Sequence, residues 1–246
     1  MKAVVLAAGE GKRMKPACPT MPKMMMPFHG KPFLEYVLTE LKEAGIEDVI
    51  LVIHPSNGFH IEDYFGDGSD YGMNIQYVLQ KERRGPAHAI AIAKDLIDTE
   101  HFLVHYGDSM TNINLPRKLV KNFIKDGLDA YLALREVKIP SRYGIVKFQD
   151  DKIIDIVEKP PEGSEPSRIA TIGIFIMKTK SYFDSIKDVK FDKGREEFPV
   201  EYILRKKGKV KGWVFSGSRV DLGKPSDIGT ASELLAVKLG MSQCVT

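Results

Sequence analysis

Glycines and basic residues follow the first apolar run of the sequence at spacings that suit phosphate chemistry. The segment LAAGEGKRMKPACPTMPKMMMP, residues 6–27, contains Gly9, Gly11, Arg13 and Lys23. Glycines let backbone N–H groups approach an anion closely, and arginine and lysine neutralise its charge. We therefore interpret the segment as a phosphate-binding loop, with an ordinary surface turn rich in glycine and lysine as the alternative.

Two common nucleotide-binding motifs do not fit this loop. The dinucleotide fingerprint needs a third glycine where Met14 stands, with a helix starting at once, and Pro16, Pro19 and Pro22 prevent such a helix. The P-loop motif fails because no Gly-Lys pair is followed by serine or threonine. A redox enzyme with a dinucleotide site is therefore disfavoured.

One carboxylate stands where an open α/β sheet would bind a ligand. Asp108 follows the apolar run FLVHYG, at the carboxyl end of a predicted strand. A carboxylate there suits Mg²⁺, which prefers oxygen ligands, although the residue could instead be a turn former. The six histidines show no metal-ligand spacing, and no Ser-His-Asp or Cys-His pattern stands out. We expect positioning and charge neutralisation rather than nucleophilic catalysis.

The elements that must position these residues alternate between strand and helix in the first half of the chain. Short, mostly apolar and β-branched runs predict strands buried on both faces, at residues 3–7, 49–53, 75–79 and 102–106. Apolar residues at helical spacing predict helices at 32–45 and 85–97. This alternation predicts a parallel sheet with helices on both faces.

The second half changes to consecutive strands with few helical signals. We predict strands at 129–137, 143–149, 152–159 and 170–177, partly antiparallel, with a hairpin turn at DDK. Helices at about 195–207 and 225–239 bracket a last strand near KGWVF, and 160–168 is predicted to be a mobile loop. These strands would extend the parallel core.

Composition excludes several classes of partner. The 246 residues include 36 basic and 33 acidic ones, a balance too even for a protein that binds nucleic acid or a membrane surface. Cys18 and Cys244 are interpreted as free thiols in a reducing compartment. No apolar stretch is long enough for a signal peptide or a membrane span. We expect a soluble cytoplasmic protein.

The quoted loop resembles the signature of a known family. LAAGEGKRM followed by PKMMMP is similar to the start of the sugar-1-phosphate nucleotidyltransferases, or NDP-sugar pyrophosphorylases, and departs from it at Lys12, where the family often has threonine or serine. The resemblance continues in order along essentially the whole chain, through GKPFLEYVLTELKEAGI, GDGSDYGMNIQYVLQ, RRGPAHAI, YGDS, RYGIVKF, IVEKP, TIGIFIM and VDLGKPSD.

The resemblance implies an α/β fold. Its architecture is a three-layer, Rossmann-like, mixed but mostly parallel sheet flanked by helices, with an appended sugar-binding strand region. The implied organisation is one nucleotidyltransferase domain over residues 1–246, with a nucleotide-binding half at 1–127 and a sugar-phosphate-binding half at 128–246. Because the chain ends shortly after its last predicted helix, we expect neither an appended β-helix nor a longer helical tail. Assembly into a homo-oligomer stays open.

The resemblance also implies a reaction. An NTP and a sugar 1-phosphate would give an NDP-sugar and pyrophosphate, with Mg²⁺ as cofactor. The sugar phosphate is already ionised near neutral pH, so its attack on the α-phosphorus needs no general base. The nearest branches favour UTP or dTTP with glucose 1-phosphate. A guanylyl- or cytidylyltransferase, and a catalytically silent regulatory relative, remain alternatives.

Site residues follow from matching motifs. Arg13, Lys23 and Asp108 would be catalytic, and Asp108 and Asp221 would hold the metal if the fold unites them. The nucleotide would contact Leu6, Ala8, Gly9, Gly11, Lys12, Gln80 and Gly85, and the Gln80 amide could pair with a uracil or thymine edge through two hydrogen bonds. The sugar phosphate would contact Tyr143, Gly144, Glu158, Lys159 and Gly173. Glu158 and Lys159 could instead be an exposed pair at a strand end.

Overall fold

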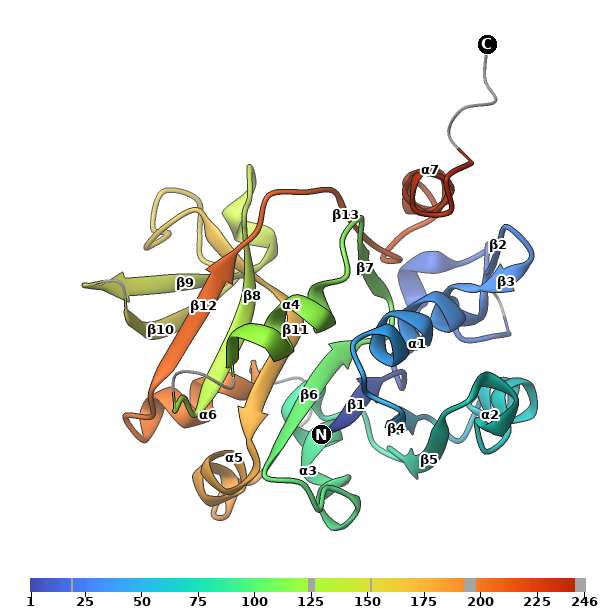
Figure 1. Ribbon diagram of the computed structural model, residues 1–246. Coiled ribbons are helices and arrows are strands. Elements are labelled where there is room, and N and C mark those ends of the chain that lie inside the picture. The colour runs from blue at the N-terminus through green and yellow to red at the C-terminus, as the bar shows by residue number, and fades with distance from the viewer. Residues whose placement is uncertain (19, 124–126, 151, 193–197, 242–246) are drawn as a thin grey trace.

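The computed structural model describes residues 1–18, 20–123, 127–150, 152–192 and 198–241. Its centre is a nine-stranded sheet in the order β10-β9-β11-β6-β1-β4-β5, with β8 beside β11 and β12 outside β8 (Figure 1). The strands are β1 (Lys2–Leu6), β4 (Asp48–Ile53), β5 (Asn74–Leu79), β6 (His101–Tyr106), β8 (Ala130–Glu136), β9 (Gly144–Gln149), β10 (Lys152–Glu158), β11 (Ile169–Lys178) and β12 (Val210–Val214).

The first half of the chain forms the parallel part of this sheet. β5, β4, β1 and β6 pair in parallel, and most apolar residues of β4, β1 and β6 are buried on both faces, whereas the edge strand β5 leaves Leu79 exposed. β11 then pairs antiparallel with β6 along one edge and with β8 along the other, so the sheet continues from one half of the chain into the other. The predicted strands are confirmed, and the predicted parallel core with partly antiparallel additions is correct.

Helices cover both faces of the sheet, as Figure 1 shows. Along β1 the side chains alternate, so Ala3 and Val5 pack in one core cluster and Val4 packs in the other. The first cluster includes residues from α1 (Phe33–Glu43), α2 (Phe59–Phe65), α4 (Leu115–Phe123) and α7 (Asp227–Lys238). The second includes residues from α3 (Gly85–Ala91), α5 (Thr179–Ile186) and α6 (Pro199–Arg205). The predicted three-layer fold is confirmed.

Several elements differ from the sequence-based expectations. The helix predicted at 85–97 is divided, because α3 ends at Ala91 and a separate 3₁₀ turn covers Lys94–Leu96. The sequence analysis missed α2, α4, α5, the hairpin β2 (Pro27–Phe28) to β3 (Lys31–Pro32), and the strands β7 (Ser109–Thr111) and β13 (Arg219–Asp221). The short strands span two or three residues, which is too few to show an apolar period.

Other expectations meet the limits of the described residues. The DDK hairpin is confirmed by the antiparallel pairing of Gln149 with Lys152, although Asp151 lies outside the described residues. Of the helix predicted at 195–207, the described part begins at Pro199. Cys18 is a buried free thiol, and Cys244 lies outside the described residues. Across the described parts of the chain, no helix has the length and apolarity that a membrane crossing requires.

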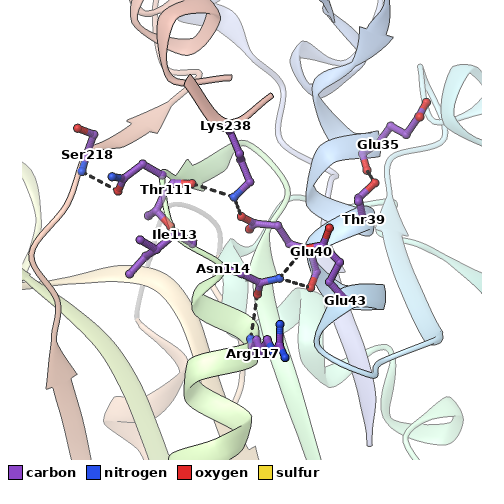
Figure 2. A network of polar contacts seen from close by, with 11 residues as sticks. Glu35, Thr39, Glu40, Glu43, Thr111, Ile113, Asn114, Arg117, Ser218 and Lys238 are labelled. Carbon is purple, nitrogen blue, oxygen red and sulfur yellow. Dashed lines mark hydrogen bonds and ion pairs between the residues drawn. The ribbon is translucent and has the colours of Figure 1, made fainter. Parts of the chain in front are cut away.

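A polar network fastens the last helix to α1 and to the short strand β7 (Figure 2). Lys238 of α7 forms an ion pair with Glu40 of α1 and donates to the carbonyl of Thr111 in β7 over 3.3 Å. Asn114 donates to the Glu40 carbonyl over 3.0 Å, while its Oδ1 accepts from the Arg117 N–H at the start of α4. The network therefore joins α1, α4 and α7 to β7, the strand that pairs with β13.

Glu40 should make stability depend on pH. Its side chain is 1% exposed and its Oε2 has no partner among the described residues. Burial raises the pKa of Glu40 from 4.5 to about 7, against the opposing charge of Lys238. The folded protein then keeps a proton that the unfolded chain releases, so this contribution to the free energy of unfolding falls by about 3 kcal/mol as pH rises from 4.5 to above 7.

Urea unfolding of the wild type and Glu40→Gln at pH 5 and pH 8 measures this effect. The variant should gain about 3 kcal/mol relative to the wild type between the two pH values, because glutamine does not titrate. Glu47→Gln, an exposed residue in the loop that follows the same helix, is the matched control, and its difference from the wild type should stay constant. Parallel pH profiles for Glu40→Gln and the wild type would contradict the prediction.

Candidate active site

A cleft of about 580 Å³ opens at the carboxyl ends of β1 and β6. It lies where the sheet divides, because β11 pairs with β9 at Ala170 but with β6 only from Ile174 onward. The predicted site residues that line it are Leu6, Ala8, Gly9, Arg13, Lys23, Gln80, Gly85, Asp108, Tyr143, Gly144, Glu158 and Gly173. Residues from both halves of the sequence therefore meet in one cavity.

Gly173 makes this division of the sheet possible. Its φ of +77° lies in the left-handed region, which other residues rarely adopt. A Cβ at this position would lie 2.7 Å from Cγ of Tyr106, the last residue of β6. The irregularity in β11 between Thr171 and Phe175 therefore depends on a residue without a side chain.

Met14, which stands where the dinucleotide fingerprint would have its third glycine, anchors the glycine loop after β1. Met14 is fully buried, and its N–H donates to the Gly11 carbonyl over 2.8 Å within the 3₁₀ turn Lys12–Met14. Gly11 has φ +67°, and a Cβ on it would lie 3.7 Å from the Cβ of Lys23. The loop therefore turns beneath Lys23 rather than starting a long helix, which agrees with the absence of a third glycine.

Lys23 and Asp108 contact each other at the floor of the cleft. The ammonium group of Lys23 donates to Asp108 Oδ2, and the two side chains are 13% and 24% exposed. Lys23 begins the 3₁₀ turn Lys23–Met25, in which Met24 and Met25 are buried. The methionines of PKMMMP pack in the core and fix the lysine backbone. A desolvated cation next to a carboxylate is suited to bind phosphate oxygens.

Asp221 reaches Asp108 through a strand pair that the sequence did not reveal. β13 pairs antiparallel with β7, placing Asp221 opposite Ser109, and the Leu222 N–H donates to the Asp108 carbonyl over 2.9 Å. Asp221 Oδ1 lies 2.5 Å from Nη2 of Arg219. Desolvation within the protein raises the pKa of the Asp221 carboxyl, although 35% of its side chain is exposed. The charge of Arg219 opposes this rise and that of Asp108 adds to it.

These two carboxylates fit a hard divalent cation that substrate helps to bind. Mg²⁺ is commonly held by one or two carboxylates, with water and phosphate oxygens completing its shell. The like charges of Asp108 and Asp221 are held close by the strand pair, where a cation would relieve their repulsion. Within the described ranges, no group of three or more histidine, cysteine, aspartate or glutamate residues could hold a metal without substrate.

Gln80 is buried in the wall of the cleft next to α3. Its Nε2 donates to the Gly85 carbonyl over 3.2 Å and lies 3.1 Å from Nδ1 of His88. Burial first, and the charge of Arg84 second, lower the pKa of His88, which favours a neutral ring that accepts this hydrogen bond. Both amide hydrogens are thus engaged and Oε1 remains as an acceptor. The arrangement offers one hydrogen bond to a base edge rather than the two expected.

The part of the cleft formed by β9, β10 and β11 is built around close backbone approach. A Cβ on Gly144 would lie 2.9 Å from Oε2 of Glu158 and 3.1 Å from Oγ1 of Thr171, so a larger residue there would displace both side chains. Tyr143 immediately precedes Gly144 at the entrance to β9. Glu158 closes β10 with its carboxylate at the cleft.

Four predicted residues do not line the cleft, namely Gly11, Lys12, Lys159 and Asp221. Lys12 is 74% exposed and its Nζ lies 3.1 Å from Glu10. Lys159 has φ +46°, and its Nζ lies 3.4 Å from Glu158 Oε1. The left-handed backbone conformation at Lys159 directs its side chain away from the line of β10. Gly11 lies next to Lys23, and Asp221 pairs with Arg219. Both Lys23 and Arg219 line the cleft.

The sequence analysis missed three arginines of the wall, Arg83, Arg142 and Arg219. Arg83 donates from Nε to the Ala8 carbonyl over 2.7 Å and so holds the glycine loop against α3. Arg83 lies within RRGPAHAI, and Arg219 lies two residues before Asp221, so motif proximity was the available signal. With Arg13 and Lys23, these residues give the cleft a cationic wall that is suited to phosphates.

A model of the nucleotidyl transferase family matches residues 2–239 of the chain. The chain belongs to this family. The low-salt glycan biosynthesis nucleotidyltransferase Agl11 of Haloferax volcanii is 34% identical over 239 residues, covering 96% of this chain and 66% of that protein. The UTP–glucose-1-phosphate uridylyltransferase of Staphylococcus haemolyticus is 32% identical over 257 residues, covering 91% of this chain and 88% of that protein.

Solved structures of nucleotidyl transferases share the fold. A Bacillus anthracis protein provisionally named a glucose-1-phosphate thymidylyltransferase, in complex with sucrose, superposes with a TM-score of 0.85 at 26% identity, covering 100% of this chain and 97% of that one. The family predicted from the loop motifs is therefore confirmed. The chain spans 66% of the length of the Haloferax relative and most of the length of the other two.

Proposed function

We propose that this nucleotidyl transferase joins UTP or dTTP to glucose 1-phosphate, giving an NDP-glucose and pyrophosphate. The observation that carries the proposal is the cleft, where Arg13, Lys23 and Asp108 face Tyr143, Glu158 and Gly173. A cationic half and a half with hydroxyl and carboxylate groups suit a nucleoside triphosphate and a sugar, respectively. Relatives named for UTP with glucose 1-phosphate and for thymidylyl transfer support these substrates.

The chain's own groups can perform the transfer by positioning and charge neutralisation. Backbone N–H groups around Gly9 approach the triphosphate, and Arg13, always charged, binds the departing pyrophosphate. A Cβ on Gly223 would lie only 3.7 Å from Nη2 of Arg13, so this guanidinium rests against the turn after Asp221. Lys23 bridges the α-phosphate and the incoming phosphate, holding the nucleophilic oxygen in line with the α-phosphorus.

Asp108 and Asp221 would hold Mg²⁺ in this proposal. When bound, the ion supplies Lewis-acid neutralisation of the charge on the α-phosphate. The present partners of the two carboxylates, Lys23 and Arg219, are cations that keep the site neutral before substrate binds. Residues 1–127 and 128–246 would then act as nucleotide and sugar-phosphate halves of one unit. Cytoplasmic location stays a prediction, and assembly into a homo-oligomer stays open.

Pyrophosphate release tests the proposed function. The purified protein is incubated with Mg²⁺, each of the common NTPs and a series of hexose 1-phosphates, and initial rates are compared. Release that depends on both substrates is the expected result, with glucose 1-phosphate the best acceptor. Nucleotide binding without pyrophosphate release in any combination would instead favour a catalytically silent relative.

UTP and dTTP should be turned over well ahead of ATP and CTP. The imide N–H of uracil or thymine can donate to Gln80 Oε1, whereas adenine and cytosine present an acceptor at the corresponding ring nitrogen. Guanine also has a ring N–H, but its larger size would press on the wall formed by Pro86 and Ala89. No described residue has a defined role towards the 2′-hydroxyl, so UTP and dTTP should be similar.

Gln80→Ala should lower kcat/KM for UTP about tenfold or more, because the imide N–H loses its partner in a buried site. Gln76→Ala, an exposed glutamine of β5, the strand that Gln80 follows, is the matched control and should behave like the wild type. Unchanged UTP turnover in Gln80→Ala would reject Gln80 as the reader of the base. A preference for GTP or ATP in the wild type would reject the pyrimidine pocket itself.

A further inference from the structure

Arg219 lines the cleft, yet its only role in the proposed reaction is to offset the negative charge of Asp221. Its side chain is 10% exposed. Nε donates to Ser109 Oγ over 3.3 Å, and Nη2 donates to the Ile172 carbonyl over 3.2 Å and pairs with Asp221 Oδ1 over 2.5 Å. The planar guanidinium is therefore enclosed and held at three points, which fixes its orientation.

The partners of Arg219 come from both sides of the cleft. Ser109 and Asp221 belong to the strand pair that carries the two carboxylates. On the other side, Ile172 belongs to β11 of the sugar half, and the ring centre of Tyr143 lies 5.9 Å from the guanidinium carbon. The guanidinium thus stands at the junction of the two halves. A sugar 1-phosphate bound in the sugar half must bring its phosphate to this junction to reach the α-phosphorus.

Three cations of the sugar half could receive that phosphate. Lys159 does not line the cleft, and its Nζ lies 3.4 Å from Glu158. Arg142 lines the cleft but is an exposed residue of a 3₁₀ turn. Arg219 is both enclosed and anchored, and its Nη1 makes no hydrogen bond to any residue in the described ranges. An anchored guanidinium with an available N–H edge loses little entropy on binding an anion.

We propose that Arg219 binds the phosphate of the sugar 1-phosphate through Nη1 while Nη2 keeps its contact with Asp221. The inference rests on the proposed function and names the residue that docks the nucleophile. A guanidinium can contact a carboxylate and a phosphate at once because its five donors point outward in one plane. Arg219 would thereby set the distance between the attacking phosphate and the metal carboxylates.

The test measures sugar-phosphate affinity separately from nucleotide affinity. In steady-state assays with UTP and glucose 1-phosphate, Arg219→Met should raise the KM for glucose 1-phosphate about 10- to 100-fold, as expected for a lost charge-assisted hydrogen bond. The KM for UTP should change less than about threefold. Arg168→Met is the matched control, because Arg168 is an exposed arginine of the same half that donates to the Lys138 carbonyl and lies outside the cleft.

Titration calorimetry with glucose 1-phosphate gives a readout that does not need turnover. The wild type and Arg168→Met should bind it alike, and Arg219→Met should bind it 10- to 100-fold more weakly. If Arg219→Met does not fold by its thermal melting curve, Arg219→Lys replaces it. Lysine keeps the charge but cannot hold two anions in one plane, so an intermediate loss of affinity is expected.

Distinct outcomes separate this inference from the proposed function. The inference is overturned if Arg219→Met raises the KM for UTP and the KM for glucose 1-phosphate equally. It is also overturned if the variant needs more Mg²⁺ but keeps the wild-type KM for glucose 1-phosphate, because Arg219 would then only support Asp221. If the wild type releases no pyrophosphate, the proposed function fails and calorimetry decides the inference. The inference is supported if Arg219→Met binds glucose 1-phosphate more weakly than the wild type while Arg168→Met does not. It is overturned if the wild type does not bind glucose 1-phosphate.

Discussion

Asp108→Asn should lower kcat by about a hundredfold or more, with activity in the wild type abolished by a chelator and restored by Mg²⁺. The carboxylate contacts Lys23 and lies beside Asp221, at the end of the central strand β6. Neutralising phosphoryl charge is worth several kcal/mol in the transition state, and asparagine keeps the shape of aspartate without its charge. Initial rates at saturating UTP and glucose 1-phosphate measure the loss.

Asp95→Asn is the matched control for this variant. Asp95 is an exposed residue of the 3₁₀ turn after α3, and its replacement should leave kcat unchanged. Thermal melting of both variants shows whether a loss of folding accounts for a loss of rate. Wild-type activity that is the same in chelator as in Mg²⁺ would refute a metal held by Asp108.

Lys23→Met should lower kcat by about a hundredfold or more while changing the KM for UTP far less. The Lys23 side chain is 13% exposed and lines the cleft, where a charge interacts more strongly with phosphate oxygens than it would in water. A contact that strengthens as charge develops on the α-phosphate is lost mainly from the transition state. Methionine preserves the length and apolar stem of lysine, so the turn formed with Met24 and Met25 should persist.

Lys15→Met tests whether any positive charge of this loop would have the same effect. Lys15 is exposed, lies in the same loop and does not line the cleft, so its variant should keep the wild-type kcat. Initial rates over a range of UTP concentrations separate kcat from KM for both variants. A Lys23→Met enzyme with normal kcat and a raised KM would mean that the lysine contributes ground-state binding only.

The parallel core and its ligand-binding edge were predictable from local sequence. β1, β4 and β6 are short apolar runs, and their burial on both faces leaves few alternatives to a parallel sheet covered by helices, to which β5 adds a partly exposed edge. The position of Asp108 directly after β6 follows from the same pattern. The loop with Gly9, Arg13 and Lys23 was also predictable, because glycine, basic residues and a preceding strand lie together in the chain.

Other elements were hidden because their stability comes from contacts rather than from their own residues. The helix α5 has the polar sequence TKSYFDSI, and it buries Tyr182 and Ile186 against residues of distant segments. The strands β7 and β13 have three residues each, and they form a pair only because the chain returns after about a hundred residues. Local propensity carries little information for segments of this length.

Local sequence shows which residue types are available for phosphate and metal chemistry. It places Arg13 and Lys23 in the loop after the first predicted strand, and Gln80 and Asp108 just after later strands. Which of these residues meet depends on the folded chain. It brought Asp221 beside Asp108 through β7 and β13, left Lys159 outside the cleft, and placed Arg219 within it. The physical reason is that side-chain direction depends on strand register and on local backbone conformation, such as the positive φ of Lys159 and Gly173. Long-range packing sets both.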